Sequence, residues 1–259
     1  MESIISDIFW QIVIRLNSID DVASLRRCCK RFRRLLTPLP RWIMAKWVWR
    51  RLKGLVPHPH QLRELLRQGL CQVSGSFVLQ CVLGKEWDGS DIDIFCHMAD
   101  CKALRAYVRE LKPYPRERHP YNLDPRFWVE SYESGCGMQP IIDFICFDRP
   151  YSIPSEFDLC QCIIVYDGRC VSSPFWDCIL NRIMRISPYW GHDGWKAAIE
   201  APAIKWRDGR MRLLNRIQKY HCRGFRFDIE DPHSVACRDF FKSHGYFDGY
   251  DKGGKSMLW

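Results

Sequence analysis

Two aspartates separated by one residue begin a short apolar run. The run Ser90–Phe95 contains β-branched and aromatic residues that favour a strand. Residues two apart in a strand point to the same face, so Asp91 and Asp93 should project side by side. Two such carboxylates repel each other unless a cation lies between them, and Mg²⁺ prefers oxygen ligands. The pair therefore indicates a site for a divalent metal ion. The alternative is a strand end where both side chains reach water.

A third aspartate, Asp143, interrupts the apolar run Ile141–Phe147. A carboxylate in such a strand is costly to bury without a partner. It would be tolerated if it faced the same cation as Asp91 and Asp93. The alternative is an edge-strand aspartate bonded to a backbone group or to an arginine.

A glycine–serine turn precedes all three aspartates. Val73–Ser76 is expected to run from a strand into a turn that opens a helix. Glycine lets the backbone approach a phosphate without a Cβ in the way. The serine hydroxyl, the free N–H groups and the helix N-terminus can then bind phosphate oxygens. Gly75 and Ser76 are therefore candidate phosphate ligands.

Strands alternating with helices are expected to position these residues, which indicates an α/β or α+β fold. After Pro174 the chain is expected to be helical again. The predicted strands are Cys71–Ser74, Ile92–Cys96, Phe127–Tyr132, Ile141–Phe147 and Leu159–Tyr166. The predicted helices are Gln61–Gln68, Phe77–Leu83, Lys102–Leu111, Phe175–Ile186 and Trp206–Cys222.

The first forty residues favour helices. Apolar residues recur at helical spacing between Ile4 and Leu16. Ser18 can cap a second helix, with Asp21 three residues later. The predicted buried side of that helix consists of Val22, Leu25, Cys28, Cys29 and Phe32.

The net charge of +9 is unevenly distributed along the chain. Residues 1–60 carry +8 and residues 203–226 carry +7, which leaves −6 for the rest. A mildly acidic body between two basic segments fits a polyanionic partner, with RNA contacted through segments 26–53 and 205–226. The alternative is that basic helices only solvate a surface.

The composition excludes several classes of protein. Hydrophobic residues make up 47% of the chain, enough for a packed core, and we find no apolar run of transmembrane length. The N-terminus does not resemble a secretory signal. The 14 cysteines are scattered through apolar runs, which favours reduced, packed thiols in a cytoplasmic or nuclear compartment. A zinc site formed by Cys160, Cys162, Cys170 and Cys178 is the alternative, but the spacing matches no known finger or ribbon.

The C-terminal helix Trp206–Cys222 combines basic and aromatic side chains. Such a helix suits a nucleoside triphosphate or a strand of RNA. We predict that Lys219 binds phosphate and that Tyr220 stacks on a base. The alternative is a solvated amphipathic helix whose core side is Met211, Leu214 and Ile217.

Gly75-Ser76, Asp91-Ile92-Asp93 and Asp143, in this order, resemble the signature of the nucleotidyltransferase superfamily, the fold of polymerase-beta-like enzymes, poly(A) polymerases and cyclic-nucleotide synthases. The resemblance covers about residues 67–168. It implies a catalytic palm in which the three aspartates bind Mg²⁺ or Mn²⁺. It also implies a nucleoside triphosphate held by Gly75, Ser76 and Ser90, and transfer of its nucleotidyl group to an RNA end.

Four further segments resemble a subfamily of these enzymes found in large DNA viruses and some fungi. They are Gly75–Gln80, Trp87–Ile94, Phe157–Cys162 and Lys219–Phe225. In Phe157–Cys162 the spacing departs by one residue from the subfamily pattern.

Residues 3–37 resemble an F-box, a short helical module. The resemblance implies docking on the Skp-type adaptor of SCF-type ubiquitin ligases. The Leu-Pro pair that usually opens an F-box is absent, because Ile5 is followed by Ser6. The alternative is that these helices simply pack on the catalytic domain.

The sequence therefore predicts an α+β chain in four parts. These are an F-box-like helical segment (1–40), a basic linker and helix (41–66), a nucleotidyltransferase palm (67–175) and a C-terminal helical region (176–259). The predicted function is a magnesium-dependent nucleotidyltransferase with no membrane partner. Two alternatives remain: an F-box-type adaptor with a non-catalytic palm, and a synthase of a small nucleotide messenger.

Overall fold

The chain folds into two compact units. A computed structural model describes residues 11–13, 15–36, 41–111, 127–132, 140–147, 157–188, 203–228 and 230–243. Unit 1 comprises Met1–Pro150 and Ile164–Ser173, and unit 2 comprises Tyr151–Ile163 and Pro174–Trp259. Within the described ranges, no helix has the length and apolar character needed to cross a membrane.

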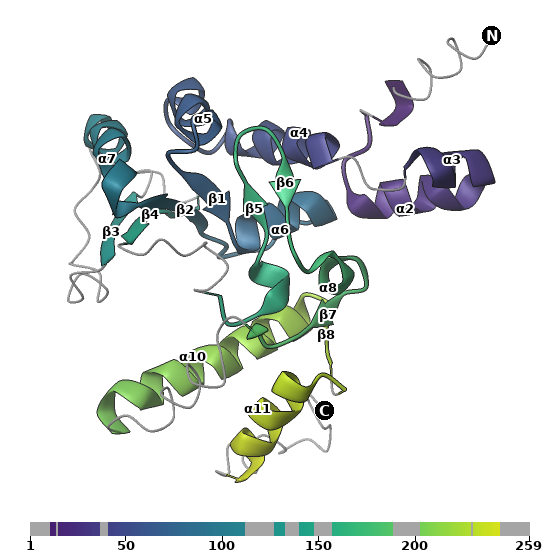
Figure 1. Ribbon diagram of the computed structural model, residues 1–259, viewed down its shortest axis with the longest axis vertical. Coiled ribbons are helices and arrows are strands. Elements are labelled where there is room, and N and C mark those ends of the chain that lie inside the picture. Colours follow the sequence, from purple (N-terminus) through teal and green to yellow (C-terminus); the bar gives the residue numbers. More distant parts are fainter. Residues whose placement is uncertain are drawn as a thin grey trace. The chain divides into compact units, whose positions relative to one another are not determined.

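A six-stranded mixed sheet forms the centre of unit 1, in the order β3-β4-β2-β1-β5-β6 (Figure 1). Strands β2 and β4 are parallel, and the other neighbours are antiparallel. The strands are β1 (Gln72–Ser74), β2 (Ile92–His97), β3 (Phe127–Tyr132), β4 (Ile142–Phe147), β5 (Val165–Tyr166) and β6 (Val171–Ser172). The predicted α+β fold is confirmed, and the first four strands lie within one residue of their predicted bounds.

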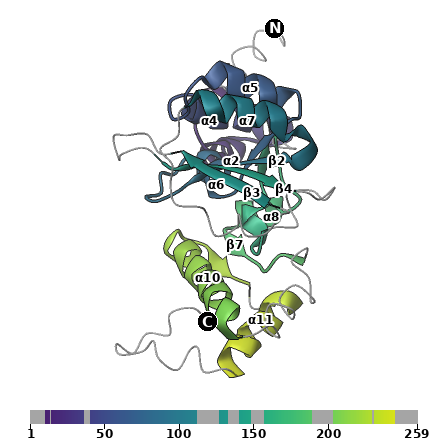
Figure 2. The same ribbon diagram turned by 90° about the vertical axis from the view of Figure 1, so that its left-hand side faces the viewer.

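Helices cover one face of the sheet. They are α4 (Arg41–Leu52), α5 (Pro59–Arg67), α6 (Ser76–Leu83) and α7 (Cys101–Glu110), the last preceded by the 3₁₀ turn η1 (Met98–Asp100). Figure 2 shows α4, α5 and α7 on the same side of the strands, and α6 packs against α4, β1 and β2. Tyr107 of α7 lies edge-on to Phe144 of β4, with ring centroids 6.0 Å apart. The side chains on this face of the central strands are almost fully buried: Val73, Ile92, Ile94, Ile142, Phe144 and Cys146.

The N-terminal helices pack on the rest of unit 1. They are α2 (Ile19–Cys28) and α3 (Lys30–Leu35). The predicted cap is confirmed, because Asp21 N donates to Ser18 Oγ at 3.1 Å. Trp47 Nε1 of α4 donates to Leu16 O at 2.5 Å, and Arg50 donates to Asn17 Oδ1 at 2.7 Å. These contacts pack the segment before α2 on α4, and a docking role for these helices stays a prediction. Most of the first predicted helix lies outside the described residues.

The predicted extension of the second helix through Cys28, Cys29 and Phe32 is wrong. Helix α2 ends at Cys28, and Cys29 is extended with φ of −159°. The Cys29 thiol caps α3 by accepting from Phe32 N at 3.4 Å. Because the chain changes direction there, both cysteines are exposed rather than buried.

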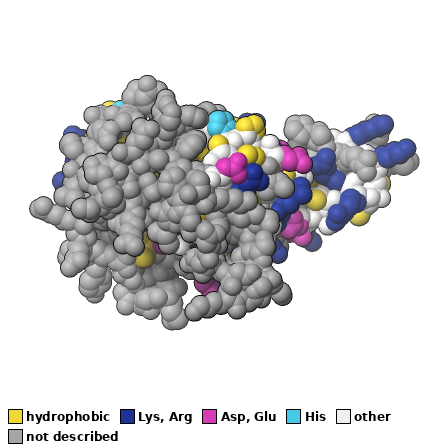
Figure 3. Space-filling view, turned by 90° about the horizontal axis from the view of Figure 1, so that it is seen from below, with side chains coloured by type: hydrophobic (Ala, Val, Ile, Leu, Met, Phe, Trp, Pro, Cys, Tyr) yellow, Lys and Arg dark blue, Asp and Glu magenta, His cyan; other side chains and the backbone are white. Residues whose placement is uncertain are grey.

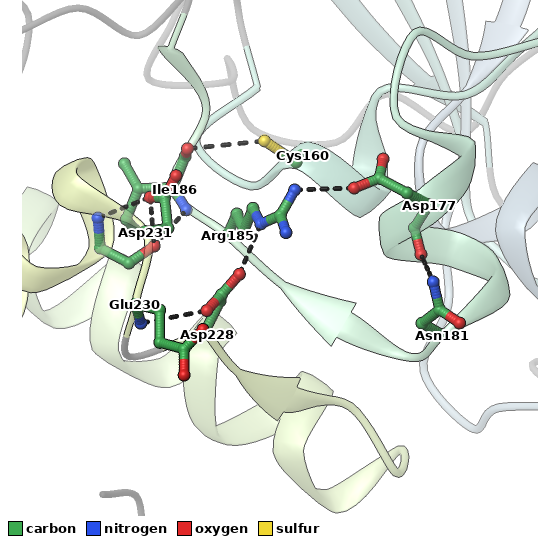
Figure 4. Close-up of polar contacts among 9 residues, drawn as sticks. Cys160, Asp177, Asn181, Arg185, Ile186, Asp228, Glu230 and Asp231 are labelled. Atoms are coloured by element: carbon green, nitrogen blue, oxygen red, sulfur yellow. Dashed lines mark hydrogen bonds and ion pairs between the residues drawn. The ribbon is translucent and has the colours of Figure 1, made fainter.

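Unit 2 is mainly helical. It contains the 3₁₀ turn η4 (Cys160–Cys162), α8 (Trp176–Leu180), α10 (Ala203–Cys222) and α11 (Pro232–Ser243). Strands β7 (Ile183–Met184) and β8 (Arg226–Phe227) pair in parallel. Arg185 donates to Asp228 Oδ2 at 2.6 Å and to Asp177 Oδ2 at 2.7 Å, which ties the segment after β7 to α8 and to the end of β8 (Figure 4).

Two predicted elements of this region are wrong. Leu159–Tyr166 is not one strand, because Leu159 bridges to Ile186 and the chain then turns through η4. Phe175–Ile186 is not one helix. Arg182 has a left-handed φ of 55°, and the following residues form β7. In both cases a partner distant in sequence takes the backbone hydrogen bonds. The predicted helix Trp206–Cys222 is confirmed within α10.

Most of the described cysteines are buried free thiols. Burial raises the pKa of Cys71, of Cys81 and of Cys162 to about 12. These thiols therefore stay protonated at neutral pH and pack as small apolar groups, as the sequence predicted.

Candidate functional site

Asp93 and Asp143 lie on neighbouring parallel strands in direct register. Asp93 of β2 is the partner of Asp143 of β4, and paired residues of adjacent strands point to the same face. Adjacent strands are about 4.8 Å apart, so both carboxylates start within reach of a shared ligand. Both aspartates are half-buried. Their face is opposite to the helix-covered one, since their neighbours Ile92, Ile94 and Phe144 alternate with them.

Asp91 stands one residue before β2 and is also half-buried. Ile92 N donates to Ile141 O at 2.8 Å, which holds the start of β2 against β4. By its position two residues before Asp93, Asp91 is expected on the same face.

Ser131 of β3 holds the Asp143 carboxylate from its other side. Its hydroxyl donates to Asp143 Oδ1 at 2.6 Å, and the two residues are register partners in the antiparallel pair of β3 and β4. A carboxylate has two oxygens with several acceptor positions. The contact with Ser131 therefore orients Asp143 without using all of its capacity to bind a cation.

The three carboxylates do not form a ready-made metal cluster. In the part of the chain that the structure describes, no three His, Cys, Asp or Glu side chains converge closely enough to hold a metal ion. The sequence predicted that Asp91, Asp93 and Asp143 would meet in one pocket. The backbone register brings Asp93 and Asp143 side by side on neighbouring strands, and a shared pocket for all three carboxylates stays a prediction. The Asp143 carboxylate accepts a hydrogen bond from the Ser131 hydroxyl.

Gly75 connects β1 to α6 in a conformation that other residues avoid. Its φ of 78° and ψ of −149° lie in a region almost restricted to glycine. Before it, Ser74 is the register partner of Asp93 and donates its hydroxyl to Ile164 O at 2.8 Å. The turn and the open N-terminus of α6 therefore begin beside Asp93, and Ser76 there is half-buried.

The loop from α6 to β2, which contains Ser90, makes two hydrogen bonds to neighbouring helices. Gln80 Oε1 accepts from Trp87 N at 3.0 Å. Arg51 of α4 donates to Lys85 O at 2.6 Å. Ser90 itself is buried. These contacts position the segment that leads into Asp91.

Sequence reasoning missed Ser131, Gln80 and Arg51. Gln80 carried a signal, because it is the only polar residue between Phe77 and Leu83 in an apolar helix. Ser131 became identifiable only once the register of β3 and β4 was known.

The predicted residues of the C-terminal helix have different surroundings. Lys219 is exposed on α10. Tyr220 is only 3% exposed and packs edge-on to Phe225, with centroids 5.7 Å apart. Burial raises the pKa of Tyr220 well above its ordinary value. The predicted stacking of Tyr220 on a base is therefore corrected, because its ring belongs to the core of unit 2.

Arg216 of the same helix is bound to a buried acid. Its guanidinium donates to Asp158 Oδ1 at 2.8 Å, and the Asp158 side chain is 8% exposed. This ion pair joins α10 to the segment before η4. Arg216 thus has a structural partner within unit 2.

The elements described above bring two kinds of group together in unit 1. Carboxylates from two parallel strands offer hard oxygen ligands for a cation. Backbone N–H groups at a glycine turn suit a phosphate. Side by side, they suit a ligand that combines phosphate groups with a divalent cation.

Solved structures of CCA-adding enzymes resemble this chain. The Thermotoga maritima enzyme, solved as a complex with tRNA, aligns with a TM-score of 0.52 at 16% identity over 79% of this chain. An apo form of a CCA-adding enzyme aligns with a TM-score of 0.47 at 15% identity over 76% of this chain. A complex of a CCA-adding enzyme with CTP aligns with a TM-score of 0.46 at 14% identity, also over 76% of this chain. No protein-family model and no curated protein matches the sequence significantly.

The chain spans 46% of the length of the Thermotoga maritima enzyme. At this identity the likeness concerns the fold. The described strands and helices of this chain therefore resemble the fold of the matched part of the Thermotoga maritima enzyme.

Proposed function

We propose that this chain is a metal-dependent nucleotidyltransferase that moves a nucleotidyl group from a nucleoside triphosphate to the hydroxyl of an RNA end. One observation carries the proposal: Asp93 and Asp143 are register partners on one face of the sheet, beside the Gly75 turn. The shared fold with a CCA-adding enzyme supports it.

The donor set fits Mg²⁺ or Mn²⁺. Asp91, Asp93 and Asp143 would hold the metal with carboxylate oxygens, which such hard cations prefer. The bound metal would lower the pKa of the acceptor hydroxyl and neutralise charge on the triphosphate. Ser131 would keep the Asp143 carboxylate oriented while Asp143 binds.

The glycine turn would bind the leaving part of the substrate. N–H groups at Gly75 and Ser76, with the Ser76 hydroxyl, would bind phosphate oxygens, and Ser90 would support the nucleotide. The acceptor oxygen would attack the α-phosphorus while its proton passes to solvent water. The bond from that phosphorus to the bridging oxygen would break, which releases pyrophosphate.

RNA is the acceptor that the charge distribution favours. Segments 26–53 and 205–226 are strongly basic, and phosphate contacts dominate the affinity of proteins for nucleic acids. Lys219 remains a proposed phosphate contact because it is exposed on α10. The Thermotoga maritima relative was solved with tRNA.

The test incubates purified protein with Mg²⁺ or Mn²⁺, each labelled triphosphate and mixed RNA, and resolves the products by gel and chromatography. Labelled RNA ends with released pyrophosphate are expected. A small cyclic or linear product would indicate the messenger synthase instead. No product with any triphosphate would overturn the proposal, and binding of a Skp-type adaptor to residues 3–37 would then be the measurement to make.

A further inference from the structure

The solvent face of α4 carries only basic and aromatic side chains. Trp42, Lys46, Trp49 and Arg50 recur at helical spacing and are exposed or half-buried, and the exposed Lys53 follows directly after the helix. The opposite face of the helix is buried in unit 1. No Asp or Glu occurs between residues 41 and 53.

Two cations lie over indole rings on this surface. Lys46 Nζ is 4.8 Å from the ring centroid of Trp42, and Arg63 Cζ of α5 is 4.7 Å from that of Trp49. His60 of α5 lies edge-on to Trp49 at 6.2 Å. We name the residues Trp42, Lys46, Trp49, Lys53, His60 and Arg63 the α4–α5 surface.

Trp42 is 41% exposed, which is unusual for so large an apolar side chain. A partly exposed indole with an ammonium over its ring offers aromatic surface and charge at the same point. Bases of single-stranded nucleic acids stack on such rings while cations bind the neighbouring phosphates.

A second basic region of unit 1 has a different character. Figure 3 shows Lys and Arg side chains over α2 and α3 next to acidic side chains, and Asp20 and Asp21 belong to the first turn of α2.

The α4–α5 surface has few acidic neighbours by comparison. The one acidic residue of α5 is Glu64, and its carboxylate accepts from Gln68 Nε2 at 3.1 Å. The α4–α5 surface is therefore the better match for a polyanion.

This surface is separate from the aspartates. Helices α4 and α5 lie on the same side of the sheet as α7 (Figure 2), and Tyr107 of α7 packs on Phe144. Asp93 and Asp143 point to the opposite face. A ligand on α4–α5 is thus not the nucleotide at the aspartates.

We propose that the α4–α5 surface binds single-stranded RNA at a distance from the catalytic centre. A base would stack on Trp42, and phosphates would contact Lys46 and Lys53. The idea that this RNA is the acceptor strand rests on the proposed function, whereas binding itself requires no turnover.

The test measures the affinity of the full chain for a labelled single-stranded RNA by fluorescence anisotropy at several salt concentrations. Trp42→Leu keeps apolar area but removes the ring, and we expect it to weaken binding by roughly 5- to 100-fold. Trp42→Phe keeps a ring and should bind close to wild type. Lys46→Ala should lower the slope of log K against log salt by about 0.7.

Lys102→Ala is the matched control, because Lys102 is exposed on α7, outside the α4–α5 surface. It should bind like wild type. If Lys102→Ala weakens binding as much as Lys46→Ala, affinity follows net charge and the proposal fails. If Lys46→Ala weakens binding but Trp42→Leu does not, the surface binds polyanions by charge alone, without base stacking. An acidic protein would bind such a surface equally well, and the proposal also fails.

Asp93→Asn separates this inference from the proposed function. The variant should bind the same RNA with wild-type affinity, since Asp93 lies on the other face. Equal binding with no product from the wild-type chain would contradict the enzyme and retain the surface. If the Trp42→Leu variant binds RNA and forms product as the wild type does, the proposed surface is contradicted and the enzyme is retained.

Discussion

Two buried glutamines differ in whether their amides have partners. Gln161 is fully buried, and among the described residues neither its Oε1 nor its Nε2 has a hydrogen-bond partner. Gln80 is 2% exposed, and its Oε1 accepts from Trp87 N. Burial of an unpaired amide is unfavourable, whereas a paired one contributes to stability.

Gln161→Met should stabilise unit 2, because it removes polar atoms and keeps most of the volume. The expected gain is about 1 kcal/mol, or roughly 2–4 °C in Tm. Gln80→Met is the control and should destabilise unit 1, since it removes the hydrogen bond from Trp87 N to Gln80 Oε1. Calorimetry on both variants checks this, and a fall in Tm for Gln161→Met would refute the prediction.

Arg185 binds two aspartates that differ in exposure. The Asp228 side chain is 16% exposed and that of Asp177 is 52% exposed. The hydrogen bond from Arg185 lowers the pKa of Asp228 below its ordinary value of 3.8. Because the folded-state pKa is the lower one, this contact stabilises the fold above about pH 4. The contribution is lost as the pH falls through the folded-state pKa.

Asp228→Asn should therefore lower the free energy of unfolding by about 1 kcal/mol at pH 7 and by less at pH 2. Asp177→Asn removes the more exposed partner and should cost at most about 0.5 kcal/mol. Denaturant unfolding at both pH values measures these differences. Equal losses for the two variants at pH 7 would contradict the account.

At the scale of elements, the end of α6 abuts the start of α2. Gly84 has φ of +61°, and a Cβ there would lie 2.4 Å from Ser18 Cβ. Gly89 has almost the same φ of +62° with no atom within 4 Å of its Cβ position. A comparison of substitutions at Gly84 and Gly89 therefore distinguishes the effect of backbone strain from that of steric contact between α6 and α2.

Both Gly84→Ala and Gly89→Ala should lower the free energy of unfolding by about 1 kcal/mol, because alanine disfavours the left-handed backbone conformation. Gly84→Ala should lose more, by about 1–3 kcal/mol, because Ser18 or α2 must move. Thermal unfolding of the two variants gives the comparison. Equal destabilisation would mean that α2 moves away freely and does not pack tightly against α6.

The sequence predicted those elements whose pattern is local. Periodicity and strand composition located β1 to β4, and capping chemistry located Ser18 at the start of α2. It failed where partners distant in sequence decide the backbone, as at Leu159 with Ile186 and at β7 with β8. Residue spacing identified Asp91 and Asp93 as a pair, but it could not supply the register that places Asp143 beside Asp93.

At the scale of the whole molecule, each unit is assembled from two separate segments of the chain. The chain passes from unit 2 to unit 1 at Ile163–Ile164 and returns after Ser173. Linear boundaries drawn on a sequence cannot represent such units. The excess of basic charge, in contrast, was visible at once, because net charge depends on composition and not on contacts.

In the proposed nucleotidyl transfer, Asp93 and Asp143 act together. The most direct measurement is the rate of Mg²⁺-dependent incorporation of a labelled nucleotide into RNA by the wild type, Asp93→Asn and Asp143→Asn. Asp88→Asn is the control, an exposed aspartate in the loop before β2. Each of Asp93→Asn and Asp143→Asn should lose several kcal/mol of charge stabilisation and should therefore be slower than wild type by at least about 100-fold. The rate of Asp88→Asn should be unchanged. Wild-type turnover by a folded Asp93→Asn or Asp143→Asn chain would contradict this joint role.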